Sequence, residues 1–138
     1  MLSKILWLSG SAIFLLLGVW HLYYIFFTNK FDPRNKSVME EMKNTSPRLT
    51  DETTMWKAWM GFNASHSAGA IFLGLVNIIL AVEYFYVIEN SFFLSLLTIL
   101  TAFFYLWLGK KYWFSIPFTG IFIAVCCFIA SPLVAFLT

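Results

Sequence analysis

Four long apolar runs, separated by polar segments, dominate the hydropathy pattern of this chain. A helix needs about 20 apolar residues to cross the hydrocarbon core of a bilayer, and it satisfies its own backbone hydrogen bonds there. The runs predict helices at about residues 5–27, 58–82, 91–108 and 116–137. We therefore predict an all-α fold, an antiparallel bundle of four transmembrane helices that forms one integral membrane domain, residues 1–138.

The composition supports a membrane protein and excludes an ordinary soluble domain. Hydrophobic residues make up 60% of the chain and charged residues 12%, whereas soluble domains contain about 25% charged residues. A domain of this size has too much surface for its interior to hide so much apolar side chain, but lipid can solvate the excess. The net charge of +2 gives no reason to expect a nucleic-acid partner.

Lysine and arginine are concentrated in two of the three connections, and this bias predicts the orientation. Residues 28–57 hold six of them and the third connection holds Lys110 and Lys111, whereas Lys4 stands alone near the N-terminus. The positive-inside rule places the first and third connections in the cytoplasm and both termini outside. The first run follows Lys4 as a signal peptide would, but its length and aromatic end predict a retained helix.

The first connection, about residues 28–57, is too long for a simple turn, so we expect it to be partly helical. Its sequence carries three signals for the start of a helix. They are Ser37 with Glu40 as a capping box, Ser46 before Pro47, and Thr50 before Asp51 and Glu52 as the start of the second long helix. The mixed charges of this connection indicate either a solvated face or a docking surface for a partner.

Polar and small residues recur at helical spacing on the second long helix. One stripe consists of Trp59, Asn63, His66, Ala70, Leu73 and Asn77. Steps of three and four residues place such a set on one side of a helix. Gly61, Ser65 and Gly69 form a ladder of small residues, which lets another backbone come close. We expect the stripe and the ladder to face protein rather than lipid.

The only two histidines of the chain are expected to meet inside the membrane. His21 lies six residues inside Phe27, roughly 9 Å along the first helix, and His66 lies eight residues inside Ala58, roughly 12 Å along the second. Both depths are counted from the same cytoplasmic connection, so the two side chains should lie at a similar level. The candidate buried polar site therefore consists of His21, His66, Asn63 and Asn77.

This site has two interpretations that the sequence leaves open. The polar side chains can serve as interhelical hydrogen bonds, which contribute about 0.6 kcal/mol each on average. Alternatively, they can bind a haem through two axial imidazoles, a quinone or lipid headgroup, or a proton. A zinc ion needs three or four ligands, and a hydrolase needs a carboxylate that orients the histidine; neither set is present at this level. We assign no catalytic and no metal-binding residue.

The last two helices carry small and hydroxylic stripes that predict packing faces. On the third helix the stripe is Ser95, Thr98, Ala102 and Tyr105, and on the fourth it is Gly120, Ala124, Cys127 and Ser131. Pro132 is expected to end or bend the fourth helix. The adjacent Cys126 and Cys127 are expected to act as small apolar side chains.

Two segments carry a resemblance to known proteins. "GFNASHSAG", which follows "TMWKAW", and "GVWHLYY" in the first helix resemble a small family of bacterial four-helix integral inner-membrane proteins with a GFNxSHSxG-like second helix. The resemblance covers nearly the whole chain. It implies that the neighbourhood of His21, Asn63 and His66 is the distinctive part of the family, and it implies no particular activity.

In length, helix number and its long first connection, the chain is also similar to the membrane-associated glutathione transferases. Their second helix carries an Arg, His, Asn and Glu pattern. Here Asn63 precedes His66, the opposite order, and no Arg or Glu lies beside them. The departure removes the residues that the resemblance would assign to binding of the thiol cofactor.

These features favour a non-catalytic membrane component, an accessory subunit that packs against a larger inner-membrane assembly or against itself. The alternative is a small-ligand or redox protein that uses His21 and His66 to hold a haem or a quinone. A transferase-like enzyme and a small transporter are less favoured. A transporter usually needs an ionisable group in its path, and the predicted helices offer only the two histidines there.

Overall fold

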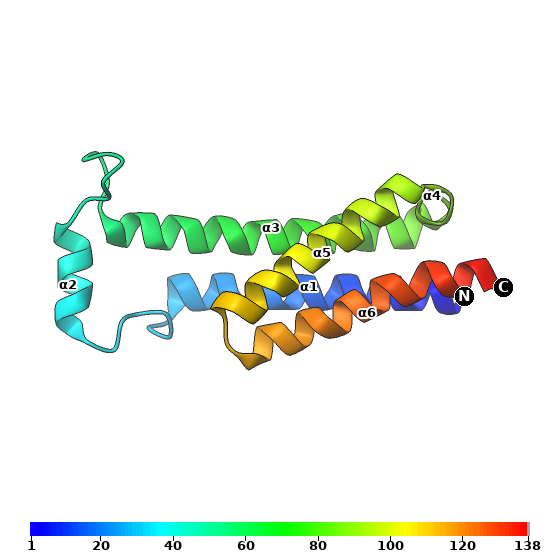
Figure 1. The fold of residues 1–138 in the computed structure, drawn as a ribbon, viewed down its shortest axis with the longest axis horizontal. Helices are drawn as coiled ribbons and strands as arrows, with labels where there is room; N and C mark the ends of the chain where they lie inside the picture. Colours follow the sequence, from blue (N-terminus) through cyan, green and yellow to red (C-terminus); the bar gives the residue numbers. More distant parts are fainter. Residues whose placement is uncertain (138) are drawn as a thin grey trace. The chain divides into compact units, whose positions relative to one another are not determined.

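The computed structural model describes residues 1–137, and the predicted all-α fold is confirmed (Figure 1). Four long helices are each apolar enough to cross a membrane: α1 (Leu2–Phe27), α3 (Met55–Glu83), α5 (Phe92–Tyr112) and α6 (Ser115–Leu137). Two short helices, α2 (Lys36–Asn44) and α4 (Phe85–Asn90), lie in the connections. The chain is thus a multi-pass membrane protein, and its long helices extend up to four residues beyond the predicted ends.

The chain forms two compact units, which are described separately here. The bundle unit consists of residues 1–17 and 70–138, and the loop unit consists of residues 18–69. The first part of α1, the last part of α3, α4, α5 and α6 belong to the bundle unit. The last part of α1, α2 and the first part of α3 belong to the loop unit. That the chain is one integral membrane domain stays a prediction.

In the bundle unit, α1 runs antiparallel to both α3 and α6. The hydroxyl oxygens of Ser3 and Ser131 are 3.0 Å apart at one end of the unit, and at the other end Gly120 packs against Leu17. This pairing places the start of α1, α4 and the last turns of α6 together at one end (Figure 1). Trp7 and Phe128 meet at a ring-centroid distance of 5.0 Å and are fully buried, as is much of the core around them.

A glycine sets the distance between α1 and α3 in the bundle unit. A Cβ atom placed on Gly74 would lie 2.6 Å from the backbone nitrogen of Leu15 and 2.8 Å from the carbonyl oxygen of Ser11. Such a close approach of two backbones is possible only where the side chain is absent. The predicted packing stripe of α5 is confirmed in the same unit, since Ser95, Thr98 and Ala102 are buried.

The predicted ladder of small residues on α3 does not face protein within this chain. Gly61, Ser65 and Gly69 are exposed, and a Cβ atom on Gly61 would meet nothing within 4 Å. The buried side of α3 instead passes through Ser67 and Gly74. Ser65 and Ser67 are two residues apart, which is about 200° around a helix, so a ladder through Ser65 points to the opposite side.

The predicted stripe on α3 is confirmed over most of its length. Ala70 and Asn77 are buried, while Asn63, His66 and Leu73 are half-buried. Trp59, at the start of the stripe, is exposed, so the buried part of α3 begins about one turn later.

The predicted capping box at Ser37 is wrong, because Asn35 caps α2. The side-chain oxygen of Asn35 accepts hydrogen bonds from the backbone N–H of Ser37 at 3.0 Å and from the Ser37 hydroxyl at 2.9 Å. The Glu40 carboxylate, which a capping box would direct back to Ser37, instead forms an ion pair with Lys43 at 3.1 Å. The cap therefore lies two residues earlier than the sequence pattern suggested.

The other two predicted helix starts are also wrong. Residues 47–50 form a turn rather than a helix after Ser46, closed by the N–H of Thr50, which donates to the carbonyl oxygen of Pro47 at 3.3 Å. The Thr50 hydroxyl accepts from the N–H of Glu52 at 3.1 Å, a local turn that uses the capping oxygen before any helix begins. The helix α3 starts at Met55, and the Thr54 hydroxyl accepts from the N–H of Lys57 at 3.3 Å.

Pro132 does not end α6, which continues to Leu137. A proline removes one backbone hydrogen bond, and membrane helices tolerate that loss where neighbouring groups compensate. Of the two predicted effects of Pro132, an end to the helix is therefore wrong, and a bend stays a prediction.

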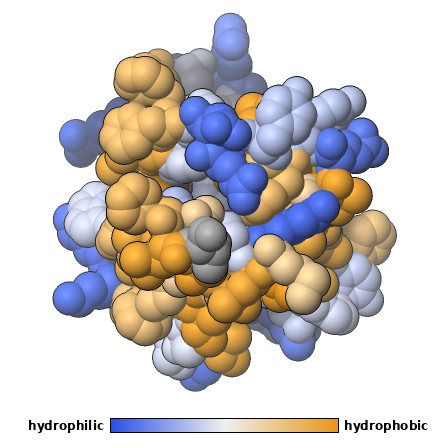
Figure 2. Space-filling view, turned by 90° about the vertical axis from the view of Figure 1, so that its right-hand side faces the viewer, coloured by the Kyte–Doolittle hydropathy of each residue, from blue (hydrophilic) through white to orange (hydrophobic). Residues whose placement is uncertain are grey.

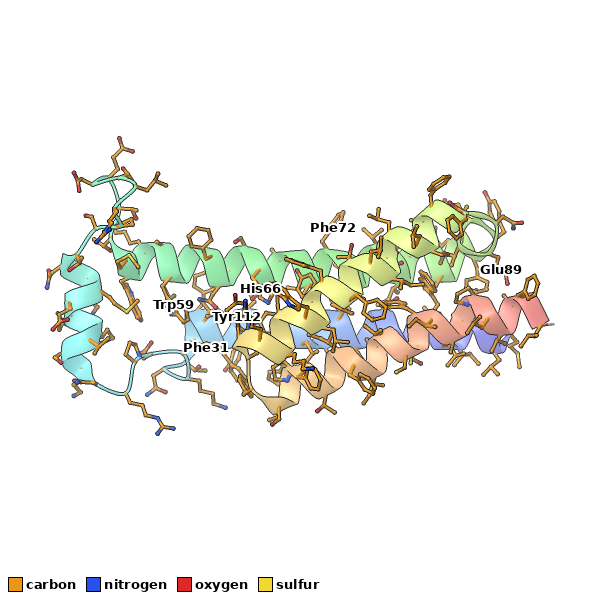
Figure 3. The ribbon with its side chains drawn as sticks, viewed as in Figure 1. Phe31, Trp59, His66, Phe72, Glu89 and Tyr112 are labelled. Carbon is orange, nitrogen blue, oxygen red and sulfur yellow. The ribbon has the colours of Figure 1, made fainter. Side chains whose placement is uncertain are left out.

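Large apolar side chains on the outside of the helices provide a surface for lipid. Phe62, Phe72 and Phe93 are 75%, 69% and 80% exposed, and Phe72 projects away from α3 in Figure 3. In water such side chains would be costly, whereas acyl chains solvate them. Figure 2 faces the end that carries α4 and both termini, where hydrophilic and hydrophobic residues lie next to one another.

Candidate functional site

The loop unit brings three of the four predicted site residues together. Nε2 of His21, on α1, lies 3.3 Å from the side-chain oxygen of Asn63, on α3. The His21 and His66 rings make an edge-to-face contact with their centroids 5.6 Å apart. The two imidazoles and the amide thus form a contiguous polar group on facing helices, which we call the histidine cluster (Figure 3 labels His66).

The hydrogen bonds of Asn63 determine which ring nitrogen of neutral His21 carries the proton. The Asn63 amide nitrogen donates to the carbonyl oxygen of Trp59 at 2.8 Å. A carbonyl oxygen can only accept, so this bond fixes the amide with its own oxygen toward His21. Nε2 of His21 must then donate, and in a neutral ring Nδ1 of His21 is left as an acceptor. The geometry fixes one tautomer of neutral His21.

An aromatic residue that the sequence analysis did not single out completes the cluster. The Phe31 ring meets the His21 ring edge-to-face with centroids 4.5 Å apart, and it comes from the first connection. Phe31 is half-buried, as are both histidines. Phe31 gives no periodic signal, because it lies in a loop rather than on a helix face. The cluster is therefore partly open, lined on one side by an apolar ring.

Asn77, the fourth predicted site residue, belongs to the bundle unit and to a different polar group. Its side-chain oxygen accepts from Nε1 of Trp7 at 3.0 Å and from the Thr98 hydroxyl at 3.3 Å. Its amide nitrogen donates to the carbonyl of Leu73 at 2.9 Å. These bonds link α1, α3 and α5, and we call the group of Trp7, Asn77 and Thr98 the asparagine cluster.

The asparagine cluster was not predicted from the sequence as a unit, although some of its residues belong to predicted stripes. Thr98 was assigned to the packing stripe of α5 and Asn77 to the stripe of α3, but Trp7 was not connected to either. An indole N–H buried in a membrane bundle needs a hydrogen-bond acceptor, and this requirement is the signal that could have predicted a bond from Trp7 to Asn77.

The histidine cluster has a limited capacity for metals and cofactors. A haem with two axial imidazoles would need one nitrogen of each histidine directed at the iron. Since Nε2 of His21 is directed at Asn63, only Nδ1 of that ring could serve. Over residues 1–137, no three side chains of His, Cys, Asp and Glu come together in a way that could hold a metal ion. The arrangement is suited instead to exchanging hydrogen bonds with a small polar group beside the two rings.

Every buried side-chain nitrogen and oxygen atom in the described part of the chain has a hydrogen-bond partner. The embedded polar residues are therefore accounted for without an external ligand, as is usual for a stable protein interior.

In comparisons with known proteins, no family model, curated protein or solved structure matches this chain. The resemblance to the small bacterial inner-membrane family stays a prediction.

Proposed function

We propose that this multi-pass membrane protein is a non-catalytic accessory subunit of the bacterial inner membrane. It packs against a larger membrane assembly or against a second copy of itself. In the proposed topology the first and third connections face the cytoplasm and both termini face outside. The reason is that eight of the nine basic residues lie in the first connection or at the helix ends that border the first and third connections.

The observation that carries this proposal is the exposed small-residue face of α3. Gly61, Ser65 and Gly69 lie one turn apart, are exposed, and leave open space where a side chain would stand at Gly61. Faces of this kind allow two membrane helices to approach closely, and packing rather than the hydrophobic effect drives such association in lipid. A helix from outside this chain fits that face.

The charged first connection supports the same proposal. It holds five basic and five acidic residues, and only Lys43 with Glu40 forms an ion pair among the residues that the structure describes. The remaining charges are available to a partner at the membrane surface, where charge complementarity favours specific association.

Site-specific photocrosslinking in native membranes tests the proposal. A photoreactive residue at Ser65 should give a discrete crosslinked product, because that position faces the partner helix. The same residue at Phe93, which is exposed on α5 and does not belong to the small-residue face of α3, is the control and should give none. A chain that is a solitary monomer in mild detergent and forms no product from Ser65 would contradict the proposal.

The ring contact between His21 and His66 favours a second candidate function, a small-ligand or redox protein. The two half-buried rings and the Phe31 ring form a partly open group in which Nδ1 of neutral His21 can accept a hydrogen bond. A quinone headgroup or another small polar molecule could occupy such a position. Ionisable groups inside membrane helices are often functional.

An absorption spectrum and an organic extract of the purified protein test the second candidate. A bound chromophore or quinone should co-purify with the wild-type chain and be lost in His66→Ala. His21→Ala should have the same effect, since both rings would contact the ligand. A colourless sample that contains neither metal nor quinone would remove this candidate.

A further inference from the structure

A cavity opens at the end of the bundle unit where α4 and the last turns of α6 lie. Its volume is about 560 Å³, and its lining includes Ser3, Ser95, Ser131, Glu89, Phe92 and Phe136. Figure 3 shows Glu89 beside the last turns of α6. Neither the histidine cluster nor the proposed partner face contributes to this cavity.

Three of the serines in the wall are almost fully buried. Ser3, Ser95 and Ser131 are 5%, 8% and 1% exposed. They come from α1, α5 and α6, so the bundle itself holds their positions. Buried hydroxyls on three helices define a fixed set of hydrogen-bonding groups rather than a mobile surface.

The hydrogen bonds of these serines determine what they can still offer. Ser131 donates to the carbonyl oxygen of Ser3 at 2.8 Å, and since that hydrogen is used, Ser3 must donate to the Ser131 hydroxyl oxygen at 3.0 Å. Ser95 donates to the carbonyl oxygen of Ile88 at 3.0 Å. All three hydroxyl hydrogens are thus engaged within the protein. Each of these three hydroxyl oxygens retains acceptor capacity, so the buried serines favour a ligand that donates hydrogen bonds.

The charge at the cavity points to the same kind of ligand. Glu89 lines it and forms no ion pair among residues 1–137. Lys4, the nearest basic residue in sequence to Ser3, donates instead to the carbonyl of Val82 at 3.1 Å and does not line the cavity. The start of α5 would favour an anion, but the Ser91 hydroxyl caps it, and an anion would also meet the Glu89 carboxylate.

Two aromatic residues add an apolar side to the lining. Phe92 and Phe136 are 71% and 89% exposed. Phenyl faces attract ammonium groups and also pack against alkyl chains. The combination of a carboxylate, acceptor oxygens and phenyl rings suits a cationic head attached to an apolar tail.

We propose that this cavity binds the primary ammonium group of an amphiphile, with Glu89 as its counter-ion and the buried serines as hydrogen-bond acceptors. The ammonium can belong to the headgroup of phosphatidylethanolamine or to a free alkylamine. The chemistry at the cavity is the same for both sources.

Native mass spectrometry of the full chain distinguishes these sources. The protein is released from nanodiscs that contain equal amounts of phosphatidylethanolamine and phosphatidylglycerol. The wild-type chain should retain phosphatidylethanolamine in preference to phosphatidylglycerol. In Glu89→Gln the ratio of the two bound lipids should fall about 10-fold, as expected when a hydrogen bond to a charged group is removed. Glu83→Gln is the matched control, since Glu83 is exposed at the end of α3 and does not line the cavity.

A second arm uses dodecylamine with protein in phosphatidylglycerol alone. Saturable dodecylamine binding that weakens in Glu89→Gln, without lipid preference in the first arm, identifies a free amine as the ligand. Ser95→Ala should weaken binding in whichever arm is positive. The proposal is overturned if neither probe binds selectively, or if Glu89→Gln and Glu83→Gln behave alike.

Discussion

The bundle unit and the loop unit differ in how far their polar side chains are buried and in how they are hydrogen-bonded. In the bundle unit, Asn77 is only 3% exposed and receives hydrogen bonds from both Trp7 and Thr98. In the loop unit, the histidine cluster is half-buried, and neutral His21 keeps an acceptor nitrogen after its bond to Asn63. The Asn77 side-chain oxygen thus has two donors within the protein, whereas one ring nitrogen of neutral His21 can still accept a hydrogen bond.

The two units also differ in how much they bury. Within residues 18–69 only Gly18, Ile25 and Ser67 are buried, and α2 has no buried residue. The bundle unit holds the buried hydrophobic cluster around Trp7, Phe14 and Phe128. Regions with few buried contacts open locally at low free-energy cost, and such regions often contain binding sites. A polar side chain inside a membrane protein therefore indicates a functional site only when its burial is considered as well.

Gly74→Ala should give the largest loss of stability, because it adds a side chain where the backbones of α1 and α3 approach each other closely in the bundle unit. The new Cβ atom would lie 2.6 Å from the Leu15 nitrogen, so the backbones of α1 and α3 must separate. We expect the free energy of unfolding to fall by about 1–3 kcal/mol or more, the range for overpacked cores. Unfolding of the purified protein in mixed detergent measures it.

Gly61→Ala is the matched control in the loop unit. Its Cβ atom would meet nothing within 4 Å, and alanine is the better helix former, so stability should stay the same or rise by up to about 1 kcal/mol. Equal losses in the two variants would mean that the two units do not differ in packing as described.

Asn77→Ala should have the next largest effect. It leaves the buried Trp7 indole N–H and the Thr98 hydroxyl without their shared acceptor, which costs about 1–3 kcal/mol for an unsatisfied buried group. Asn90→Ala, whose amide bonds only to the Tyr86 carbonyl on an exposed surface, is the control and should change stability little. The cost of Asn77→Ala should shrink in a Trp7→Phe, Thr98→Val background; an unchanged cost there would show that these bonds are not its source.

The sequence alone predicted the helices well because lipid imposes simple rules on them. A span must be long, apolar and helical, so the four helices and the stripe through Asn63, Ala70 and Asn77 could be read from periodicity. The meeting of His21 and His66 was also foreseen, since depth along two helices can be counted from their shared connection.

Features for which two neighbouring residues or faces are equally suitable could not be predicted in the same way. Asn35 and Ser37 both suit a helix cap, and in the structure Asn35 is the cap while Glu40 pairs with Lys43. The ladder through Ser65 and the face through Ser67 are both made of small residues, and the three-dimensional packing selects the second. Phe31 reaches His21 from a loop, for which sequence spacing gives no rule.

His66→Ala and Asn63→Ala should reduce stability less than Asn77→Ala does. Their side chains are half-buried, and hydrogen bonds between membrane helices contribute only about 0.6 kcal/mol on average. The same unfolding measurement, made on all three variants, ranks them. A loss in His66→Ala as large as that in Asn77→Ala would make the histidine cluster a structural element like the asparagine cluster and would remove the contrast between the units.

Asn35→Ala should have the smallest effect on the whole protein, confined to α2 in the loop unit. Removing a cap costs about 1 kcal/mol of helix stability, and a nine-residue helix with no buried residue has little other support. Hydrogen exchange of the α2 amides should therefore speed up by about fivefold, while global unfolding stays unchanged. Ser37→Ala is the control: it removes only the hydroxyl that donates to Asn35 and leaves the capping bond to the Ser37 N–H intact, so exchange should change less. A larger effect from Ser37→Ala would instead restore the capping box that the sequence pattern favours.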